Sequence, residues 1–391
     1  MIFRYDQEVL KHDIQANCGR KYQQCSISVM DTIADPDITF DSNGICNYYY
    51  HYKNVEDELN KDFPNKEGFL LKEIENIKAK SKNFPYDCIL GVSGGVDSTY
   101  SAYIAKLYNL RVLCVHFDNG WDSELAVKNI ENIVNKLNFD LYTYVINWEE
   151  FKAIQLAYFK ANVIDIEAVT DIAIGNALHK ICLQKNIKTV LHGNNIVTEN
   201  VLPDSWICKN QFNLLKIYSH WNKKKMKSYP LKHFSDMIKI RFLKPYSSLD
   251  ILNYVTYNKK DAKKIIVKQL GWRDYGGKHY ESIFTRFYQG YILPHKFFVD
   301  KRKPHLSNLI FSGQITKVEA IKELKSPIYD EVVLKSDYPF VLKKLELTEE
   351  EFDAYIKAPQ VQHKLYGIEH TIYGQYPILN ILRPLYKIIK K

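Results

Sequence analysis

The sequence lacks an apolar run of the roughly 18 residues that a membrane-spanning helix requires. Its opening stretch, MIFRYDQEVLKHD, carries charges where a secretory signal peptide has an apolar core. The seven cysteines are an odd number scattered along the chain, which does not suit a disulfide framework. Together, these absences predict a cytoplasmic protein with no membrane span.

Acidic residues are fewer than basic ones, and the formal net charge is +9. The excess of positive charge is concentrated in WNKKKMK (221–227), NKKDAKK (258–264) and DKRKPH (300–305). Such segments can form a plain solvated face, bind an anionic small substrate or bind a nucleic acid. Nucleic acid is the least favoured of the three, because no separate RNA-binding domain is evident in the sequence.

Apolar strand-like segments and helix-like segments alternate from residue 86 onward. We predict strands at 86–93, 111–118, 140–147, 188–194 and 238–246, and helices at 97–110, 123–138, 149–161 and 173–186. This alternation indicates an α/β fold built on a doubly wound parallel sheet. Ligands of such sheets bind beyond the carboxyl ends of the strands, where the stretches SGGVDS, HFDNGW, VTD and HGNN fall.

The stretch SGGVDS (93–98) follows the first of these strands and has the composition of a phosphate-binding loop. Its glycines let the backbone approach a ligand, and the N–H groups at the start of the next helix favour an anion. Ser93 and Ser98 add hydroxyl donors, whereas Asp97 repels a phosphate unless Mg²⁺ lies between the two. The lysine of a GxxxxGKS/T loop and the spacing of GxGxxG are both absent, which excludes these two common phosphate loops.

Between a buried strand and a helix, SGGVDS resembles the PP-loop of the ATP pyrophosphatase superfamily, whose fold is adenine nucleotide alpha hydrolase-like. The resemblance implies that the loop holds the β,γ-pyrophosphate of ATP, and that the ends of the second and fourth strands also touch the nucleotide. It implies two Mg²⁺ ligands, Asp97 and Glu199, although Glu199 taken alone suits a surface carboxylate better than a metal ligand. The residues assigned to ATP in this way are Val92, Ser93, Gly94, Gly95, Val96, Asp97, Ser98, His116, Phe117, Asp118, Gly193, Asn194 and Asn195.

Two longer stretches, 29–48 and 269–320, resemble the N-acetyl sugar amidotransferases, which act in surface polysaccharide, flagellin-sugar and O-antigen biosynthesis. They read VMDTIADPDITFDSNGICNY and QLGWRDYGGKHYESIFTRFYQGYILPHKFFVDKRKPHLSNLIFSGQITKVEA. The resemblance implies that ATP adenylates the carbonyl oxygen of a sugar acetamido group and that ammonia then displaces AMP, which leaves an acetamidino group. The implied substrates are similar to precursors of pseudaminic or legionaminic acid, or to a diacetamido-hexuronic acid.

The second of these stretches contains the residues that we assign to the sugar reaction. By resemblance, Lys278 stabilises the phosphate or adenylate, and His279 accepts a proton when ammonia attacks. The alternative is that Lys278, His279 and Glu281 are all surface or packing residues. Asp171, in VTDIAI, is a candidate for substrate binding or for a helix N-cap. The full set assigned to the substrate is Asp171, Trp272, Tyr275, Lys278, His279 and Glu281.

Two features are missing from this chain: the glutaminase of the asparagine synthetase type and the family's pair of complete CxxC knuckles. Residue 2 is Ile and there is no G-x-C-x-G elbow, so we expect no built-in glutaminase, and ammonia comes from solution or from a separate partner subunit. The family's N-terminal module resembles a zinc ribbon with two CxxC knuckles, but here Ser28 and Tyr49 stand where the second thiolates belong. Cys25 and Cys46 alone do not make a closed tetrahedral site, and the alternative is that Cys18 and His51 complete one. We expect instead a module held by packing and without zinc.

The sequence therefore divides into three predicted regions. They are a degenerate zinc-ribbon-like module at 1–60, an ATP pyrophosphatase domain at 61–250, and a helical substrate or partner region at 251–391. Two other functions stay open at this point: an ATP pyrophosphatase that modifies tRNA, and a partner subunit that binds nucleotide without turnover.

Overall fold

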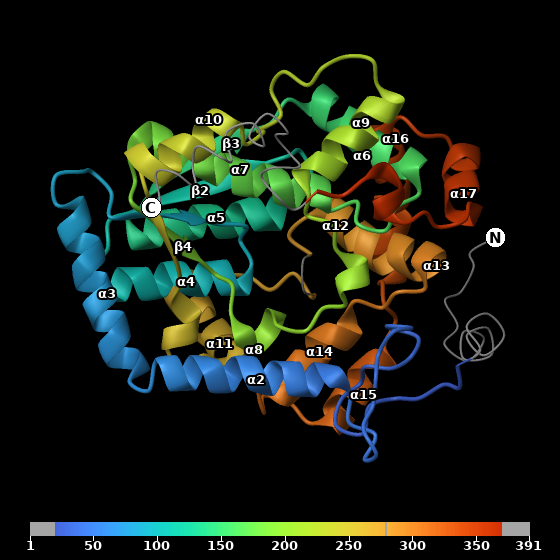
Figure 1. Ribbon diagram of the computed structural model, residues 1–391, viewed down its shortest axis with the longest axis horizontal. Helices are drawn as coiled ribbons and strands as arrows, with labels where there is room; N and C mark the ends of the chain where they lie inside the picture. Colours follow the sequence, from blue (N-terminus) through green and yellow to red (C-terminus); the bar gives the residue numbers. More distant parts are fainter. Residues whose placement is uncertain (1–19, 278–279, 370–391) are drawn as a thin grey trace, which may run out of the picture.

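The computed structural model describes residues 20–277 and 280–369, and its centre is a five-stranded parallel sheet (Figure 1). The strands lie in the order β3-β2-β1-β4-β5, so the chain builds one half of the sheet outward from β1 and then crosses to build the other half. The switch point of the topology therefore falls between β1 and β4. The strands are β1 Cys88–Gly91, β2 Val112–Asp118, β3 Asp140–Val145, β4 Thr189–His192 and β5 Ser247–Asp250.

Alternating side chains of the strands enter two different apolar cores, one on each face of the sheet. Cys88 and Leu90 of β1 belong to the core shared with α3, α4, α5 and α11. Ile89 belongs to the core shared with α7. These helices are α3 Lys66–Ser81, α4 Val96–Leu107, α5 Glu124–Leu137, α7 Ala168–Lys185 and α11 Lys259–Leu270. Helices on both faces of a parallel sheet confirm the predicted doubly wound α/β fold.

The predicted fifth strand, 238–246, is wrong. That segment forms the end of α10 Phe234–Ile238 and a π-helical turn, Lys239–Leu243, and the fifth strand is Ser247–Asp250. The alternation of apolar and basic residues in IKIRF is typical of a half-buried strand, but Ile238 and the following Leu243 are exposed. The residue that enters the core is Leu249, which pairs with Leu191 of β4.

The C-terminal half of the described chain is mostly helical, and helices there share a core with the N-terminal segment. Cys25, Met30 and Tyr52 belong to the same apolar cluster as Phe287 and Phe352. In Figure 1, residues 20–46 lie beside α14 and α15, and α2 runs along the same edge of the molecule. The remaining helices are α2 Asn47–Asp62, α6 Trp148–Ala161, α8 Ile196–Glu199, α9 Gln211–Trp221, α12 Ile283–Phe287, α13 Leu293–Phe297, α14 Arg302–Phe311, α15 Lys317–Leu324, α16 Glu331–Leu345 and α17 Glu349–Lys357, with short turns at Asp204–Trp206, Ile251–Tyr254, Tyr288–Ile292 and His363–Tyr366.

Three of the four knuckle positions of the N-terminal segment meet in its interior. The Cys46 N–H donates to Cys25 Sγ at 3.3 Å, and Ser28 Oγ lies 3.9 Å from Cys46 Sγ. Hydrogen bonding to Cys46 lowers the pKa of the Cys25 thiol. The ring of Tyr49, at the fourth position, packs against Phe311 at 5.5 Å. The division of the chain into three regions and the absence of zinc both stay predictions.

None of the helices in the described ranges is long and apolar enough to cross a membrane.

Candidate functional site

The predicted phosphate loop lies at the carboxyl end of β1, beside the switch point of the sheet. Gly94 has a φ of +81°, and a Cβ there would lie 2.9 Å from the carbonyl oxygen of Ala126. Gly95 is the N-cap of α4, whose first residues are Val96 and Asp97. Both conformation and close packing therefore require glycine at 94, and the free N–H groups of α4 face the loop.

The serine hydroxyls of the loop point toward each other. Ser93 Oγ and Ser98 Oγ are 3.4 Å apart, and the Gly95 N–H donates to Ser93 Oγ at 3.2 Å. Val92, just before the loop, is buried, and its N–H donates to the Val115 carbonyl of the neighbouring strand. A rigid strand thus ends in a short loop lined with hydroxyl and N–H donors, which is what a phosphate group needs.

The turn after β4 lies directly against this loop, as the sequence predicted. A Cβ on Gly193 would lie 3.0 Å from the Ser98 nitrogen, so the two backbones touch. Asn195 is buried and caps α8, because its side chain accepts the Thr198 N–H at 2.9 Å. Asn194 is exposed at the edge of the site.

Asp97 contacts a residue that sequence reasoning missed, Tyr257, whereas Glu199, the last residue of α8, is exposed. The Tyr257 hydroxyl donates to Asp97 Oδ1, and the Thr198 hydroxyl lies 3.5 Å from Asp97 Oδ2. Burial raises the pKa of Tyr257 far above its usual range, and the charges of Asp97 and then Glu199 raise it further. Asp97 therefore accepts a hydrogen bond from the Tyr257 hydroxyl, and Glu199 acts on this hydroxyl through its charge.

This pair of carboxylates suits Mg²⁺ held jointly with a nucleotide. Mg²⁺ takes one or two carboxylates and completes its shell with phosphate oxygens and water. Within the described ranges, no cluster of three or more His, Cys, Asp or Glu side chains could hold a metal by itself. The residues present thus fit a metal that arrives with the phosphates, and do not fit a closed protein cage.

The end of β2 supplies a buried histidine next to the loop. His116 Nε2 lies 3.3 Å from the Asp122 carboxylate. Burial alone would lower the pKa of His116, but the hydrogen bond to Asp122 and its charge outweigh burial and raise it. Phe117 stacks on Tyr144 at 5.6 Å, and Asp118 accepts the Gly120 N–H at 2.8 Å. The adenosine contacts assigned to His116, Phe117 and Asp118 stay predictions.

The segment that begins at residue 271, within the stretch 269–320, contacts the phosphate loop. Trp272 Nε1 and the Tyr275 hydroxyl both donate to the Gly94 carbonyl oxygen, at 2.7 and 3.0 Å. Further along, the Glu281 carbonyl accepts the Ser123 N–H at 2.8 Å. The substrate roles assigned to Trp272, Tyr275 and Glu281 stay predictions. The structure shows that Trp272 and Tyr275 contact the phosphate loop.

Of the remaining predicted substrate residues, the structure describes Asp171 but not Lys278 or His279. Asp171 lies in the first turn of α7, whose N-cap is Glu167, and it pairs with Lys209 Nζ at 2.9 Å. Burial lowers the pKa of Lys209, but the charges of Asp171, Asp165 and Glu199 raise it overall. Lys209 is therefore paired with Asp171, and no motif in the sequence indicated this lysine. Lys278 and His279 lie outside the described residues.

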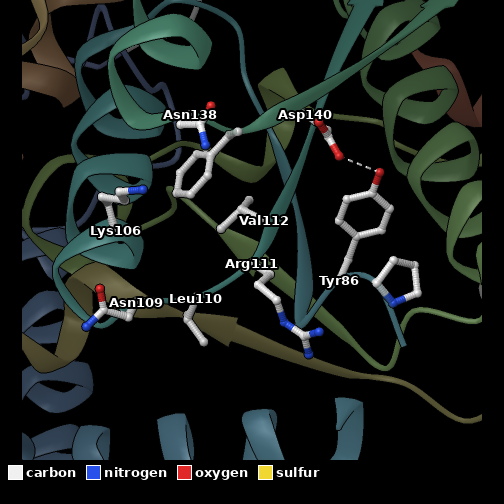
Figure 2. Close-up of a pocket in the computed structure, with 10 residues that line it drawn as sticks. Tyr86, Lys106, Asn109, Leu110, Arg111, Val112, Asn138 and Asp140 are labelled. Carbon is white, nitrogen blue, oxygen red and sulfur yellow. Dashed lines mark hydrogen bonds between the residues drawn. The ribbon is translucent and has the colours of Figure 1, made fainter. Parts of the chain in front are cut away.

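A cavity of about 410 Å³ lies at the opposite edge of the sheet, where β2 and β3 begin (Figure 2). Figure 2 shows Tyr86 donating to Asp140, at 2.8 Å, across this cavity. Its arginine, Arg111, already donates to the Asp87 carboxylate and to the carbonyl of Phe84. The cavity is thus remote from the phosphate loop, and its arginine is engaged in holding the fold.

Comparison with known proteins gives one family match and no curated relative. Residues 281–379, about a quarter of the chain, match the family model described as "LPS biosynthesis protein WbpG-like, C-terminal domain". No curated protein matches the sequence. The C-terminal part of the chain is therefore similar to a domain of lipopolysaccharide biosynthesis proteins.

Two solved structures are similar to parts of the chain. NMN synthetase from Francisella tularensis is 17% identical, with a TM-score of 0.27, over 33% of this chain and 55% of that chain. The chain thus spans about half the length of that enzyme. The NH3-dependent NAD synthetase from Campylobacter jejuni subsp. jejuni NCTC 11168, in complex with the nitrate ion, is 13% identical, with a TM-score of 0.31, over 76% of this chain and 99% of that chain.

Proposed function

We propose that this chain is an ATP-dependent N-acetyl sugar amidotransferase of surface-glycan biosynthesis, acting in the cytoplasm. One observation carries the ATP part of this proposal. A loop of hydroxyl and N–H donors lies at the switch point of a parallel sheet, with Asp97 beside it and Glu199 nearby. The sugar part is supported by the sequence resemblance of 269–320 and by the lipopolysaccharide family match of 281–379.

The proposed reaction has two steps. The carbonyl oxygen of a sugar acetamido group attacks the α-phosphorus of ATP, and the bond to the bridging oxygen breaks with release of pyrophosphate. Ammonia then attacks the imidate carbon and loses a proton, and AMP leaves with the former carbonyl oxygen. The product is an acetamidino sugar. An amide is a poor electrophile, and adenylation is needed because it turns the oxygen into a leaving group.

The residues near the loop have distinct tasks in the first step. The hydroxyls of Ser93 and Ser98 and the N–H groups of α4 bind the β,γ-phosphates. Asp97 and Glu199 would hold Mg²⁺, which supplies charge compensation for the pyrophosphate when bound. Tyr257 fixes the orientation of the Asp97 carboxylate by donating to Oδ1, which leaves Oδ2 turned toward Thr198.

The sugar is proposed to lie between the phosphate loop and the pair formed by Asp171 and Lys209. A lysine paired with an aspartate offers both a donor and an acceptor, which suits sugar hydroxyls and a sugar carboxylate. Lys278, His279 and Glu281 belong to the same proposed site, with Lys278 at the phosphate or adenylate and His279 as the base for ammonia. A separate glutaminase subunit is the proposed source of the ammonia.

The proposal is tested by following ATP consumption with a panel of diacetamido sugars and ammonium, with the products separated. We expect AMP and pyrophosphate with one sugar only, and a product lighter by the difference between O and NH. Formation of ADP, or AMP formation that no sugar stimulates, would overturn the proposal. Stimulation by tRNA in place of a sugar would instead assign the chain to tRNA modification, and nucleotide binding without turnover would make it a non-catalytic subunit.

A further inference from the structure

The carboxylate of Glu281 lies against the phosphate loop, beside the residue that caps α4. A Cβ on Gly95 would lie 3.1 Å from Ser93 Oγ, 3.5 Å from the Tyr275 hydroxyl and 3.6 Å from Glu281 Oε1. Ser93 Oγ also accepts the Gly95 N–H at 3.2 Å, and its hydroxyl is one of the groups proposed to bind phosphate. A carboxylate from the C-terminal half of the chain therefore lies at the same point of the loop as a proposed phosphate-binding group.

Backbone hydrogen bonds hold Glu281 in this place. The Ser123 N–H donates to the Glu281 carbonyl at 2.8 Å. Two residues further along, the Ile283 N–H donates to the Trp121 carbonyl at 2.7 Å, and the two segments run antiparallel between these bonds. Trp121 is fully buried, and its ring packs on that of Phe284 at 5.1 Å. Glu281 therefore reaches the loop from a backbone that is fixed to the end of the second strand.

The place beside Gly95 is one that favours negative charge. Gly95 is the N-cap of α4 and makes no side-chain hydrogen bond to the helix. The first N–H groups of an α-helix have no partner within the helix, and together with the helix dipole they favour an anion. A phosphate of the nucleotide and the carboxylate of Glu281 therefore compete for the same field. Asp97 adds a second carboxylate in the first turn of α4.

Tyr275 lies close to both of these carboxylates. Its hydroxyl donates to the Gly94 carbonyl at 3.0 Å. Burial raises the pKa of Tyr275 far above its usual range, and the charges of Glu281 and then Asp97 raise it further. The loop residue between Gly94 and the helix thus has two negative charges near it, one from each half of the chain.

These charges affect which anions the loop can take. Glu281 is half-buried, so water screens its charge only in part. A phosphate oxygen that binds next to Gly95 is therefore repelled by the carboxylate. A divalent cation bound to the phosphates reduces this repulsion, because it offsets two negative charges of the anion.

We propose that Glu281 is a specificity-determining residue of the phosphate site, which disfavours metal-free phosphate anions and admits their Mg²⁺ complexes. An amide at this position favours an anion at the loop whether or not a cationic side chain also contacts Glu281, because it removes one negative charge from the same place. The proposal rests on the proposed function only in taking the loop as a phosphate site. It adds a task at the loop to the sugar contact proposed for Glu281.

The test measures the binding of inorganic pyrophosphate to the full-length protein by calorimetry, with Mg²⁺ and with the metal removed by a chelator. We expect Glu281→Gln to bind metal-free pyrophosphate about tenfold more tightly than wild type, because one repulsive charge is removed. With Mg²⁺ the gain should fall to about threefold or less, because the complex carries less negative charge. Glu281→Asp keeps the charge and should stay close to wild type. Glu349→Gln, at an exposed carboxylate in the first turn of α17, is the matched control and should not differ from wild type.

Thermal unfolding checks that each variant is folded, which we expect because the bonds that hold 281–283 come from the backbone. Equal or weaker binding of metal-free pyrophosphate in Glu281→Gln overturns the proposal, and so does an equal gain with and without Mg²⁺. Absence of Mg²⁺-pyrophosphate binding in wild type would overturn both this proposal and the assignment of the loop to phosphate. If pyrophosphate binds as expected but no sugar stimulates AMP formation, only the proposed function fails.

Discussion

Trp272 donates its indole N–H to the carbonyl oxygen of Gly94 at 2.7 Å, across 178 residues of sequence. The indole is buried, and the Tyr275 hydroxyl donates to the same oxygen at 3.0 Å. Gly94 is the residue of the phosphate loop with a positive φ, and its peptide orientation decides where the following N–H groups point. The C-terminal region therefore sets the shape of the loop that the N-terminal half of the sheet carries.

The first prediction follows from this contact. Trp272→Phe should weaken ATP binding several-fold and lower the free energy of unfolding by ~1 kcal/mol, because it removes one of the two donors to this buried carbonyl and Tyr275 retains the other. Trp221→Phe is the control, since Trp221 is exposed on α9. Calorimetry with ATP and denaturant unfolding give the two quantities. Unchanged ATP affinity in Trp272→Phe would show that the loop keeps its shape without the indole.

The parts of the fold that the sequence predicts correctly are those with a local signal. Strands β1 and β2 are short apolar runs, and the SGGVDS loop carries its glycines and hydroxyls within six residues. The fifth strand has one buried apolar residue, Leu249, and follows a more strand-like segment, so local pattern chose the wrong stretch. Burial against β4 determines which segment forms the fifth strand, and burial depends on contacts across the whole chain.

The residues of the candidate site were likewise predictable only where a local motif contains them. Asp97 stands in a motif and was found, whereas Tyr257 and Lys209 stand in no motif. Each of these two gains its place through a contact with a residue distant in sequence, such as the 160 residues that separate Tyr257 from Asp97.

The second prediction concerns the proposed metal carboxylate. Asp97→Asn should abolish most Mg²⁺-dependent release of AMP, because an amide does not carry the charge that the metal needs. The fold should stay intact, since the amide oxygen can still accept the hydrogen bond from Tyr257. Thermal unfolding and AMP release against Mg²⁺ concentration measure the two effects. Near-normal turnover in this variant would remove Asp97 from the metal site.

The third prediction concerns the ion pair that joins the N-terminal segment to α14. Lys303 Nζ lies 2.5 Å from Asp31 Oδ2, and both side chains are at most 2% exposed. Lys303→Met leaves a buried carboxylate without its cation, so we expect a loss of ~3–5 kcal/mol in the free energy of unfolding. The double variant with Asp31→Asn should lose clearly less than the sum of the two single losses. Additive losses, measured by urea unfolding, would mean that the two charges are not coupled.

The fourth prediction concerns the pH dependence of stability. Asp165 is fully enclosed, and burial raises the pKa of its carboxyl to about 7, with the charges of Asp171 and Glu167 adding to the effect. The unfolded carboxyl titrates near pH 4. The folded state therefore binds more protons than the unfolded state between these values, and stability from this group is present below pH ~4 and lost as pH rises through ~7.

Asp165→Asn removes this titration while keeping an acceptor for the Cys208 N–H, which Asp165 Oδ2 accepts at 2.7 Å. We therefore expect the variant to gain ~3 kcal/mol of stability relative to wild type as the pH rises from 5 to 8, because about two pH units of the pKa difference lie in this range. Asp353→Asn, at an exposed carboxylate on α17, is the control and should follow wild type. If the free energies of unfolding of wild type and Asp165→Asn change with pH in parallel across this range, Asp165 stays ionised in the folded protein. In that case the basic groups nearby, of which Lys301 is one, offset the repulsion between ionised Asp165 and its acidic neighbours Asp171 and Glu167.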